Sequence, residues 1–255
     1  MSVRDRTPQW LDLDGAVNAR AVIPGVLLRA DNLQSLSAED VRRLVDEEAL
    51  EVVLDLRTDT EVEREGPGPI TAAPGVRIEH RSLYPDSGGN TDLDAAVKPW
   101  GREDQEGLPD ETPIVRAYMS YLQRRPDSVV ASVRTIARAD GAVLVHCAAG
   151  KDRTGVVVGI ALDASGVDRD AIVSDYLATD ERIHAIFERL LSSPTYREEL
   201  KDTYPTTHAP QAATMDRFFA LVDERYGGSA EWLTAHGLDD ADLERLRQRV
   251  AGLNS

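Results

Sequence analysis

One segment of the chain joins a short apolar strand to an apolar helix through an abrupt polar loop, and it constrains the fold most. The run Ala142 to His146 (AVLVH) predicts a buried strand, and a helix is expected from about Thr154 to Ser165, which contains the apolar run GVVVGIAL. Gly166 stands where helices commonly end. A buried strand that leads directly into a buried helix favours an α/β protein, in which helices cover a central sheet.

Strands and a helix predicted earlier in the chain agree with this fold class. Strands are expected at Val26–Arg29, Val52–Leu56 and Val76–Leu83, where apolar residues cluster in short runs. A helix at Ala38–Glu48, which Ser37 can cap, joins the first two strands in a βαβ-like unit.

The second half of the chain is predicted to be almost entirely helical. A helical pattern from Ile114 to Ala139 breaks near Pro126, and Asp86–Glu111 before it has no sustained period, which predicts a long surface loop. The later helices are expected at Asp168–Thr179, Glu181–Leu191, Thr195–Asp202, Gln211–Tyr226, Ser229–His236 and Asp239–Ala251. Pro205–Pro210 interrupts them and is a candidate hinge. Together these elements predict a central, mostly parallel sheet flanked by helices.

Charge and cysteine content exclude several classes of protein. The chain has 255 residues, with 29 Lys and Arg against 45 Asp and Glu and a formal net charge of −16. We expect no nucleic-acid partner, because proteins that bind nucleic acid concentrate positive charge. The single cysteine, Cys147, excludes an intramolecular disulfide and favours a reducing, cytoplasmic compartment. We expect neither a secretory signal in the charged segment Met1–Asp14 nor membrane insertion, since no window approaches the roughly 18 apolar residues of a membrane span.

The residues His146 to Gly155 (HCAAGKDRTG) are those that phosphoryl transfer through a cysteine requires. A free thiol titrates near about pH 8.5, so a nucleophilic cysteine needs positive surroundings to become a thiolate. The amides from Ala148 through Ala149 to Arg153, if they point inward, would supply those surroundings together with the positive end of the next helix. The same N–H groups fit the three equatorial oxygens of a phosphoryl group that Cys147 attacks in line.

Other residues of this loop have distinct expected tasks. The planar guanidinium of Arg153 can hold two phosphate oxygens. Gly150 lets the backbone approach the ligand closely. Thr154 can hydrogen-bond the thiolate and assist it as a leaving group. His146 would orient the loop through backbone carbonyls, and Lys151 would add positive charge at the rim.

The loop and several longer segments resemble a known enzyme family. HCAAGKDRTG is similar to the C-x5-R phosphate loop of cysteine-dependent protein tyrosine phosphatases, in the form that an atypical bacterial branch has. The segments LLRADNLQSLSAEDVRRLV, VVLDLRTDTEVEREGPG and VDRDAIVSDYLATD resemble stretches that this branch has in the same order, so the resemblance covers nearly the whole chain. It implies one tyrosine phosphatase-like α/β domain over residues 1–255, with a helical lid at roughly 180–215 above the active site.

The resemblance also implies roles within the loop. Cys147 would be the nucleophile and Arg153 the phosphate clamp, while Lys151 and Asp152 are the extra residues that distinguish this branch. Ala148 departs from the pattern, because a mycobacterial member has an aromatic residue there. A smaller side chain could open the pocket wall and weaken the preference for aryl substrates. No metal and no other cofactor is expected.

The general acid has three candidates. An aspartate must protonate the leaving oxygen and later activate water. Asp152 is favoured because the loop aspartate is the usual acid in the branch that the chain resembles, and Asp86 in LYPD is second. Asp55 in DLR is third, and a turn-capping or orienting role suits it at least as well. The adjacent Arg57 can either line the phosphate pocket or pair with Glu61 across a turn.

These observations favour a metal-independent phosphomonoesterase that works through a phosphocysteine intermediate. Phosphotyrosine in proteins is the expected substrate, with side activity on phosphoinositides, phosphoserine or phosphothreonine. A small phosphorylated metabolite, such as a sugar, nucleoside or natural-product intermediate, is the alternative, supported by Ala148 and the acidic loop. A non-catalytic phosphate-binding module is a rival of another class, and the intact Cys147 and Arg153 argue against it. In each case phosphate or another oxyanion is expected to bind the loop.

Overall fold

A computed structural model describes residues 8–84 and 108–251 of the chain. Within these residues a six-stranded sheet has the order β1-β2-β3-β6-β4-β5. The strands are β1 (Gln9–Trp10), β2 (Arg20–Ile23), β3 (Leu27–Ala30), β4 (Leu50–Asp55), β5 (Arg77–His80) and β6 (Ala142–His146). Strands β3, β6, β4 and β5 run parallel, whereas β1 and β2 extend the sheet in antiparallel pairs.

The strand β6 lies between two parallel neighbours and is buried on both faces. Val143 and Val145 belong to the larger hydrophobic core, and Leu144 belongs to the smaller core on the opposite face, since successive side chains of a strand alternate. Its last residue, His146, is in register with the last residues of β3 and β4. The loops that follow these three strands therefore meet at one edge of the sheet, where α/β proteins commonly place their ligand sites.

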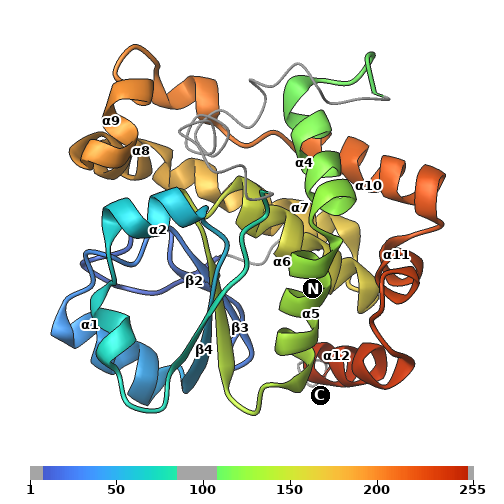
Figure 1. The fold of residues 1–255 in the computed structure, drawn as a ribbon, viewed down its shortest axis with the longest axis horizontal. Helices are drawn as coiled ribbons and strands as arrows, with labels where there is room; N and C mark the ends of the chain where they lie inside the picture. The colour runs from blue at the N-terminus through green and yellow to red at the C-terminus, as the bar shows by residue number, and fades with distance from the viewer. Residues whose placement is uncertain (1–7, 85–107, 252–255) are drawn as a thin grey trace.

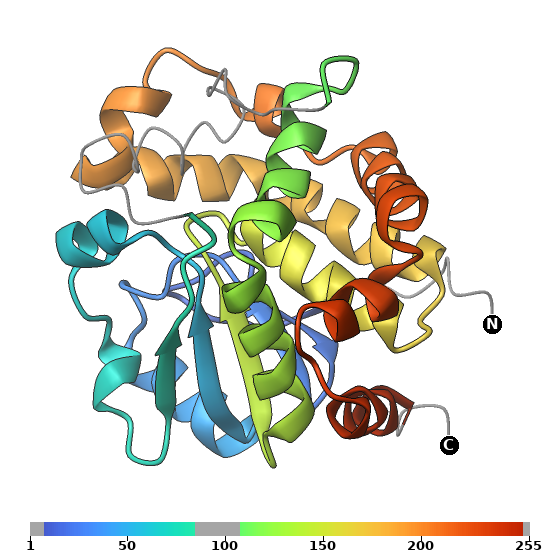
Figure 2. The same cartoon turned by 45° about the vertical axis from the view of Figure 1, so that its right-hand side comes forward.

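Helices cover both faces of the sheet (Figures 1 and 2). The smaller layer contains α1 (Ala38–Arg42), the π-helical turn η2 (Arg43–Glu47) and η3 (Pro69–Ala72). The larger layer contains α4 (Pro113–Arg124), α5 (Pro126–Arg138), α6 (Asp152–Ala164), α7 (Arg169–Ala178), α10 (Ala212–Tyr226), α11 (Ser229–Ala235) and α12 (Asp240–Ala251). Near the carboxyl ends of the parallel strands lie α2 (Asp59–Glu65), η4 (Thr179–Arg182), α8 (Ile183–Ser192), α9 (Pro194–Leu200) and η5 (Pro205–His208).

Capping residues fix where several of these helices begin and end. Ser37 and Thr58 start α1 and α2 with capping boxes, in which the side chains of Asp40 and Glu61 bond back to the cap N–H. Gly166 has a φ of +82° just after α6, the left-handed conformation that glycine favours at helix ends. The capping box on α2 is important for the site, because it fixes the buried carboxylate of Glu61 in place.

The predicted α/β class with a mostly parallel central sheet is confirmed. The strand predicted at Ala142–His146 has the predicted bounds, and the helices predicted after Gly166 are present to within two residues at each end. The helix predicted from Thr154 begins earlier, at Asp152. The strand β2 was not predicted, because only three apolar residues follow Arg20 before a proline, and α2 was not predicted, because charged residues dominate that helix. Most of the predicted loop from Asp86 lies outside the described residues.

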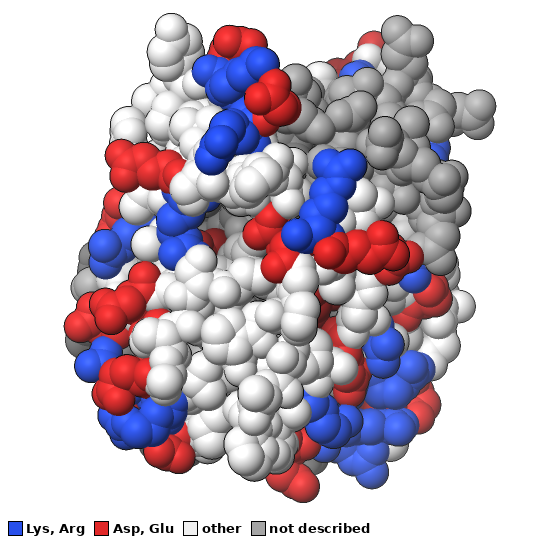
Figure 3. All heavy atoms as spheres, turned by 60° about the vertical axis from the view of Figure 1, so that its left-hand side comes forward, with Lys and Arg blue, Asp and Glu red and all other residues white. Residues whose placement is uncertain are grey.

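One face of the molecule shows mixed charge. In Figure 3, acidic and basic side chains stand in groups around a broad uncharged area. Among the described helices, none combines the length and the apolar character that crossing a bilayer requires.

Candidate active site

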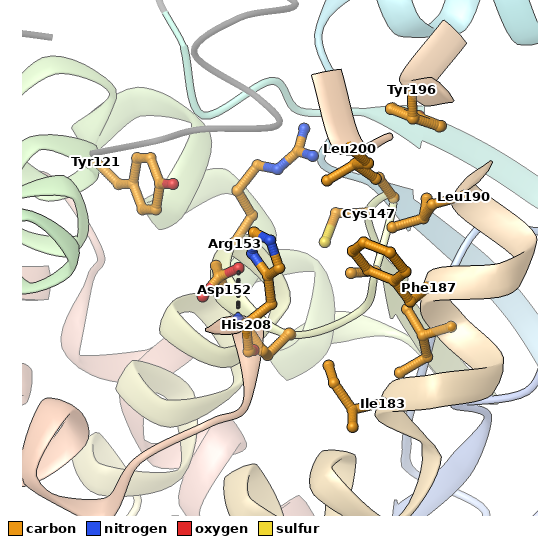
Figure 4. Close-up of a pocket in the computed structure, with 14 residues that line it drawn as sticks. Tyr121, Cys147, Asp152, Arg153, Ile183, Phe187, Leu190, Tyr196, Leu200 and His208 are labelled. Carbon is orange, nitrogen blue, oxygen red and sulfur yellow. Dashed lines mark hydrogen bonds and ion pairs between the residues drawn. The ribbon is translucent and has the colours of Figure 1, made fainter. Parts of the chain in front are cut away.

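The loop formed by residues 147–151 connects the end of β6 to the start of α6 and forms the floor of a pocket (Figure 4). Cys147 lies in this pocket with 2% of its surface exposed. In Figure 4 the side chains of Arg153 and Asp152 lie on one side of it, and apolar side chains of α8, including Phe187, lie on the other. The first turn of α6 is not capped by any described side chain, so its N–H groups remain available to an anion in the loop.

Donors outside the loop hold the carbonyl groups of residues 148–151. These donors are the backbone N–H of Asn32, the side-chain amide of Asn18 and the guanidinium of Arg29, at N···O distances between 2.7 and 3.3 Å. In a trans peptide the N–H points away from the C=O. Because the carbonyls are bound on the outside, the loop can turn its amides toward Cys147, as phosphate binding requires.

Gly150 is the loop position that a side chain could not occupy. Its φ is +66°, a conformation that L residues rarely adopt. A Cβ there would lie 2.3 Å from the carbonyl oxygen of Ala30 at the end of β3. The loop therefore packs directly against the neighbouring strand, which fixes its distance from the sheet.

His146, the residue before the cysteine, is buried and neutral. Its Nδ1 lies 3.3 Å from the carbonyl oxygen of Cys147, and its Nε2 lies 3.6 Å from Oδ1 of Asp55. Burial lowers the pKa of His146 to about 4, although the Asp55 carboxylate opposes this effect. The ring is therefore placed to orient the loop backbone, the task expected from the sequence, and as a neutral imidazole it is not a general acid at neutral pH.

Arg153 is buried and makes a two-bond contact with Glu61 of α2. Its Nη1 and Nη2 donate to the two carboxylate oxygens at 2.6 and 3.0 Å. The hydroxyl of Tyr196 on α9 donates to Oε1 of Glu61 at 3.0 Å. Burial alone would raise the pKa of Glu61, but Arg153 outweighs burial and holds that pKa below its ordinary value. The ionised carboxylate thus fixes the plane of the guanidinium beside Cys147.

One predicted alternative for Arg57, an ion pair with Glu61, is wrong, because Arg57 binds Asp55. Its Nε and Nη2 donate to the Asp55 oxygens at 2.9 and 2.6 Å. Arg57 is also not among the described side chains that line the pocket. Burial would raise the pKa of Asp55, but His146 and Arg57 together hold it well below its ordinary value. A buried carboxylate that stays ionised is unsuited to donate a proton, so the structure favours the orienting role for Asp55.

Asp152, the favoured acid, lines the pocket with a partly exposed side chain. The hydroxyl of Tyr118 on α4 donates to its Oδ1 at 2.6 Å and lies 2.9 Å from the hydroxyl of Tyr176. Burial raises the pKa of Tyr118 well above its ordinary value, so this hydroxyl stays protonated and orients the carboxylate. Asp152 is therefore held by a tyrosine hydroxyl. Asp86, the second candidate, lies outside the described residues.

Lys151 is buried, so the rim position predicted for it is wrong. It is 6% exposed, and its Nζ donates to the carbonyl oxygen of His208 at 2.5 Å. Nζ also lies 3.6 Å from Oδ2 of Asp152.

Thr154 follows Arg153 in α6 and is fully buried. Its hydroxyl has no hydrogen-bond partner among the residues that the structure describes.

A small apolar cluster packs over the loop, and it is separate from the two cores of the sheet. It consists of Ala148, Phe187, Tyr196 and Leu200. We refer to α8, α9 and η5, residues 183–208, as the helical cover. Ala148 and Ala149 line the cavity above the cysteine. This cavity measures about 60 Å³, room for only a few water molecules.

Several residues of this site were not identified from the sequence. Glu61 had a readable signal, because its spacing after Thr58 is that of a capping box, but nothing in that spacing indicates Arg153 as its partner. Arg29 had a weaker signal, a charge within an apolar run that predicts a buried strand. Tyr118 and Tyr196 had none, since aromatic residues in helices usually serve packing.

Comparisons with known proteins agree with this geometry. A family model described as the tyrosine phosphatase family matches residues 12–252. The triple specificity protein phosphatase PtpB of Mycobacterium tuberculosis is 28% identical, and the match covers 99% of this chain and 100% of that protein. A tyrosine-protein phosphatase of Nostoc commune is 25% identical, and the match covers 97% of this chain and 82% of that protein. The chain therefore belongs to the tyrosine phosphatase family and is a cysteine-dependent phosphatase of that type.

Proposed function

We propose that this enzyme removes phosphate from phosphotyrosine in proteins, without a metal ion, through a phosphocysteine intermediate. The observation that carries the proposal is the loop itself, whose carbonyls are bound outside while Cys147 lies in the pocket with Arg153 fixed beside it. Inward amides and a planar guanidinium are complementary to the equatorial oxygens of a phosphoryl group in its transition state. A cysteine that served only packing would need none of these donors.

In the first step the thiolate of Cys147 attacks phosphorus in line with the leaving oxygen. A sulfur–phosphorus bond forms, the bond from phosphorus to the tyrosyl oxygen breaks, and Asp152 gives that oxygen its proton. The loop amides and Arg153 hold the three remaining oxygens, which carry the negative charge. The hydrogen bond from Tyr118 keeps the Asp152 side chain oriented during this transfer.

In the second step water attacks the phosphocysteine. Asp152, now a carboxylate, takes a proton from the water, the sulfur–phosphorus bond breaks, and inorganic phosphate leaves. The electron pair of the broken bond returns to Cys147 as a thiolate. The buried hydroxyl of Thr154, which has no other partner among the described residues, is available to hydrogen-bond that sulfur.

Replacement of the nucleophile tests the proposal. Cys147→Ser is expected to abolish hydrolysis of an aryl phosphate while it still binds a phosphotyrosine peptide, because the amides and Arg153 remain. Vanadate should inhibit the unmodified enzyme, and a chelator should leave its rate unchanged. Hydrolysis that persists in Cys147→Ser, or that a chelator abolishes, contradicts the proposal.

The role of Asp152 has a separate test. Asp152→Asn should lower kcat on a phosphotyrosine peptide about 10²-fold or more, because general acid–base catalysis typically contributes about 10² to 10⁴. The loss should shrink on an aryl phosphate with an acidic phenol, which leaves without a proton. Asp163→Asn, near the other end of the same helix, is the matched control. An Asp152→Asn enzyme with an unchanged kcat would transfer the role to Asp86.

We further propose that the chain forms one domain in which the helical cover acts as a lid. The pocket is too small for a tyrosine side chain, so a protein substrate requires the cover to move. The apolar cluster over the loop is small, so its separation costs less than unfolding of the main cores, although the cover also carries the Arg189–Asp31 ion pair. Side activity on phosphoserine, phosphothreonine or phosphoinositides is part of this proposal and requires the same opening.

A small phosphorylated metabolite is the second candidate substrate, because it requires a smaller opening of the cover than a protein does. Ala148 contributes little volume to the pocket wall, so the loop itself offers no aromatic contact to a substrate ring. Rates on phosphotyrosine peptides and on a panel of sugar, nucleoside and other phosphates distinguish the two. Faster turnover of the peptides supports the protein substrate, and poor turnover of every peptide with fast turnover of one metabolite supports the alternative. The single unpaired cysteine leads us to propose the cytoplasm as the place of either reaction.

A further inference from the structure

Two arginines are buried behind the phosphate-binding loop. Arg20 on β2 and Arg29 on β3 are 0% and 1% exposed and stand opposite each other in the antiparallel pair. Asp175 of α7 accepts from Nε of Arg20 at 2.8 Å and from Nη1 of Arg29 at 2.5 Å. One carboxylate thus pairs with two guanidiniums, which leaves this group of three with a net positive charge. At the surface Glu181 and Arg182 flank Trp10 and add one charge of each sign.

Both arginines are connected to the loop backbone. Nη2 of Arg29 donates to two of its carbonyl oxygens, that of Gly150 at 2.7 Å and that of Lys151 at 3.3 Å. Nη1 of Arg20 donates to Oδ1 of Asn18 at 2.6 Å. The Asn18 amide in turn donates to the carbonyl oxygen of residue 149 at 2.9 Å. The two guanidiniums therefore determine, directly or through Asn18, which way the peptide groups of residues 149–151 face.

The positive charge of this group persists at neutral pH. Burial and the neighbouring Arg29 lower the pKa of Arg20 to about 10, against the opposing effect of Asp175, and the guanidinium remains protonated at pH 7. Burial would raise the pKa of Asp175, yet the two arginines outweigh burial and keep the carboxylate ionised. Nε of Arg29 is buried without a hydrogen-bond partner in the described part of the chain. An unbalanced buried cation is costly, which indicates an anion nearby as its counterpart, and the thiolate and the bound phosphoryl group are anions on the other side of the loop.

We propose that Arg29, supported by Arg20 and Asp175, is a positioning residue that turns the loop amides toward Cys147 and supplies part of the positive potential that stabilises the thiolate and the bound phosphoryl group. Arg29 does not touch the substrate and acts through the carbonyls that it binds. The inference rests on the proposed function and deepens it, because it assigns a source of anion stabilisation outside the C-x5-R segment.

Other charged and titratable groups also surround the cysteine. They come from β6, α6, β4, α2, α4, α9 and η5, and they are His146, Lys151, Asp152, Arg153, Asp55, Arg57, Glu61, Tyr121, Tyr196 and His208. None of them is altered in the variants below. A change in the reactivity of Cys147 in those variants is therefore due to the altered group.

The test separates the charge of Arg29 from its hydrogen bonds. Arg29→Gln keeps one amide donor but loses the charge, and Arg29→Lys keeps the charge but loses the forked donors. Three quantities are measured on each full-length variant: the pH midpoint of alkylation by iodoacetamide, the inhibition constant for vanadate, and kcat/KM on an aryl phosphate. Arg138→Gln on α5, whose side chain pairs with Asp242, is the control for loss of an arginine elsewhere.

For Arg29→Gln we expect an upward shift of the alkylation midpoint by about half a pH unit or more, vanadate binding about tenfold weaker, and a comparable fall in kcat/KM. In Arg29→Lys the alkylation midpoint should lie close to that of the unmodified enzyme. Its kcat/KM should stay low, because one ammonium cannot bind two carbonyls with the geometry of a guanidinium. Arg138→Gln should match the unmodified enzyme. A folded Arg29→Gln with an unchanged midpoint and unchanged vanadate binding overturns the inference.

Asp175→Asn decides the question if Arg29→Gln does not fold. Removal of the carboxylate leaves both guanidiniums and raises the net positive charge behind the loop, so the alkylation midpoint should move to lower pH. An unchanged or higher midpoint overturns the inference. Failure of the proposed function looks different, since the unmodified enzyme would then hydrolyse no aryl phosphate. If the unmodified enzyme is active and the Arg29 and Asp175 variants do not differ from it, the positioning role is refuted and the proposed function still stands.

Discussion

Behind the phosphate-binding loop, charged and amide side chains bind the backbone, whereas in front of it the helical cover contacts the loop mainly through apolar side chains. The rear contacts come from Asn18, Arg29 and the N–H of Asn32, each with a fixed donor direction. The front contacts are those of the cluster around Ala148 and Phe187, together with the hydrogen bond from Lys151 to the carbonyl of His208. The two sides of the loop are thus held by contacts of different character.

The difference explains how one site can be rigid and still admit a substrate. A buried hydrogen bond that is broken without replacement costs about 1 to 3 kcal/mol for the group left unpaired, so the rear of the loop resists rearrangement. Apolar contacts have no such directional requirement, and a small cluster can separate while the main cores stay intact. The rear therefore fixes the amides that stabilise the transition state, and the front is suited to open and close.

Glu61 binds both Arg153 beside the loop and Tyr196 of the helical cover, so its replacement should have the largest effect. Glu61→Gln leaves Arg153 buried beside a neutral amide, and removal of one member of a buried ion pair typically costs about 3 to 5 kcal/mol. We expect a loss in unfolding free energy of about 3 kcal/mol and a fall in kcat/KM of about 10²-fold or more, measured by urea denaturation and steady-state kinetics.

Glu65→Gln in the same helix is the control for Glu61→Gln. Glu65 accepts hydrogen bonds from Asn32 and Ser193 but has no contact with Arg153 among the described interactions. Its replacement should lower stability less and leave kcat/KM within a few-fold. Equal effects of the two substitutions would contradict the role assigned to Glu61.

The packing of the rear against β3 is tested by a matched pair of glycines. Gly150 and Gly166 both have positive φ, +66° and +82°, but a Cβ on Gly166 would meet no atom within 4 Å. Gly166→Ala should cost about 1 kcal/mol from backbone strain alone. Gly150→Ala should cost about 2 kcal/mol more, because its Cβ overlaps a backbone carbonyl, and it should lose most activity. Thermal unfolding and activity of the two variants check this, and equal stabilities would show that the loop is not fixed against the strand.

The pH dependence of stability tests the buried His146 at the rear. Its folded pKa of about 4 lies below the unfolded value of about 6.5. The unfolded chain therefore binds the additional proton between these values, so this contribution to stability is complete above pH 6.5 and is lost as the pH falls toward 4. Unfolding by urea at pH 7 and pH 5 should show the loss, about 2 kcal/mol at pH 5, and His146→Asn should remove most of the difference. A difference of the same size in His146→Asn would contradict the assignment.

Tyr196→Phe should have the smallest effect, because it removes only one hydroxyl at the front. The hydrogen bond to the Glu61 carboxylate contributes about 1.5 kcal/mol to closure of the cover, and the apolar contacts of the ring remain. We expect faster proteolytic cleavage within residues 183–208 and activity within several-fold. Tyr204→Phe, at a tyrosine that is 75% exposed, should show neither change. Equal cleavage rates for the two variants would show that this hydroxyl does not hold the cover.

The sequence predicted those features that depend on neighbours along the chain. The strand before Cys147, the helix after it and the helices of the tail follow from local apolar patterns, and they are present. The partners of Arg57 and Arg153 could not be predicted this way, because Glu61 reaches Arg153 from a separate helix and thereby leaves Arg57 to Asp55. The burial of Lys151 depends on η5, which is distant in sequence. Long-range contacts of this kind leave no periodic signal in the chain.

The central claim is that Cys147 becomes phosphorylated while residues behind the loop keep its amides in place. Acid quench of the enzyme within its first turnover of an aryl phosphate, followed by mass spectrometry of the peptide that contains Cys147, tests it directly. The account predicts a phosphoryl group on Cys147 that accumulates in Asp152→Asn, in which water is no longer activated, and that is absent from Cys147→Ser. Turnover without any phosphorylated Cys147, or phosphorylation of another residue, would contradict it.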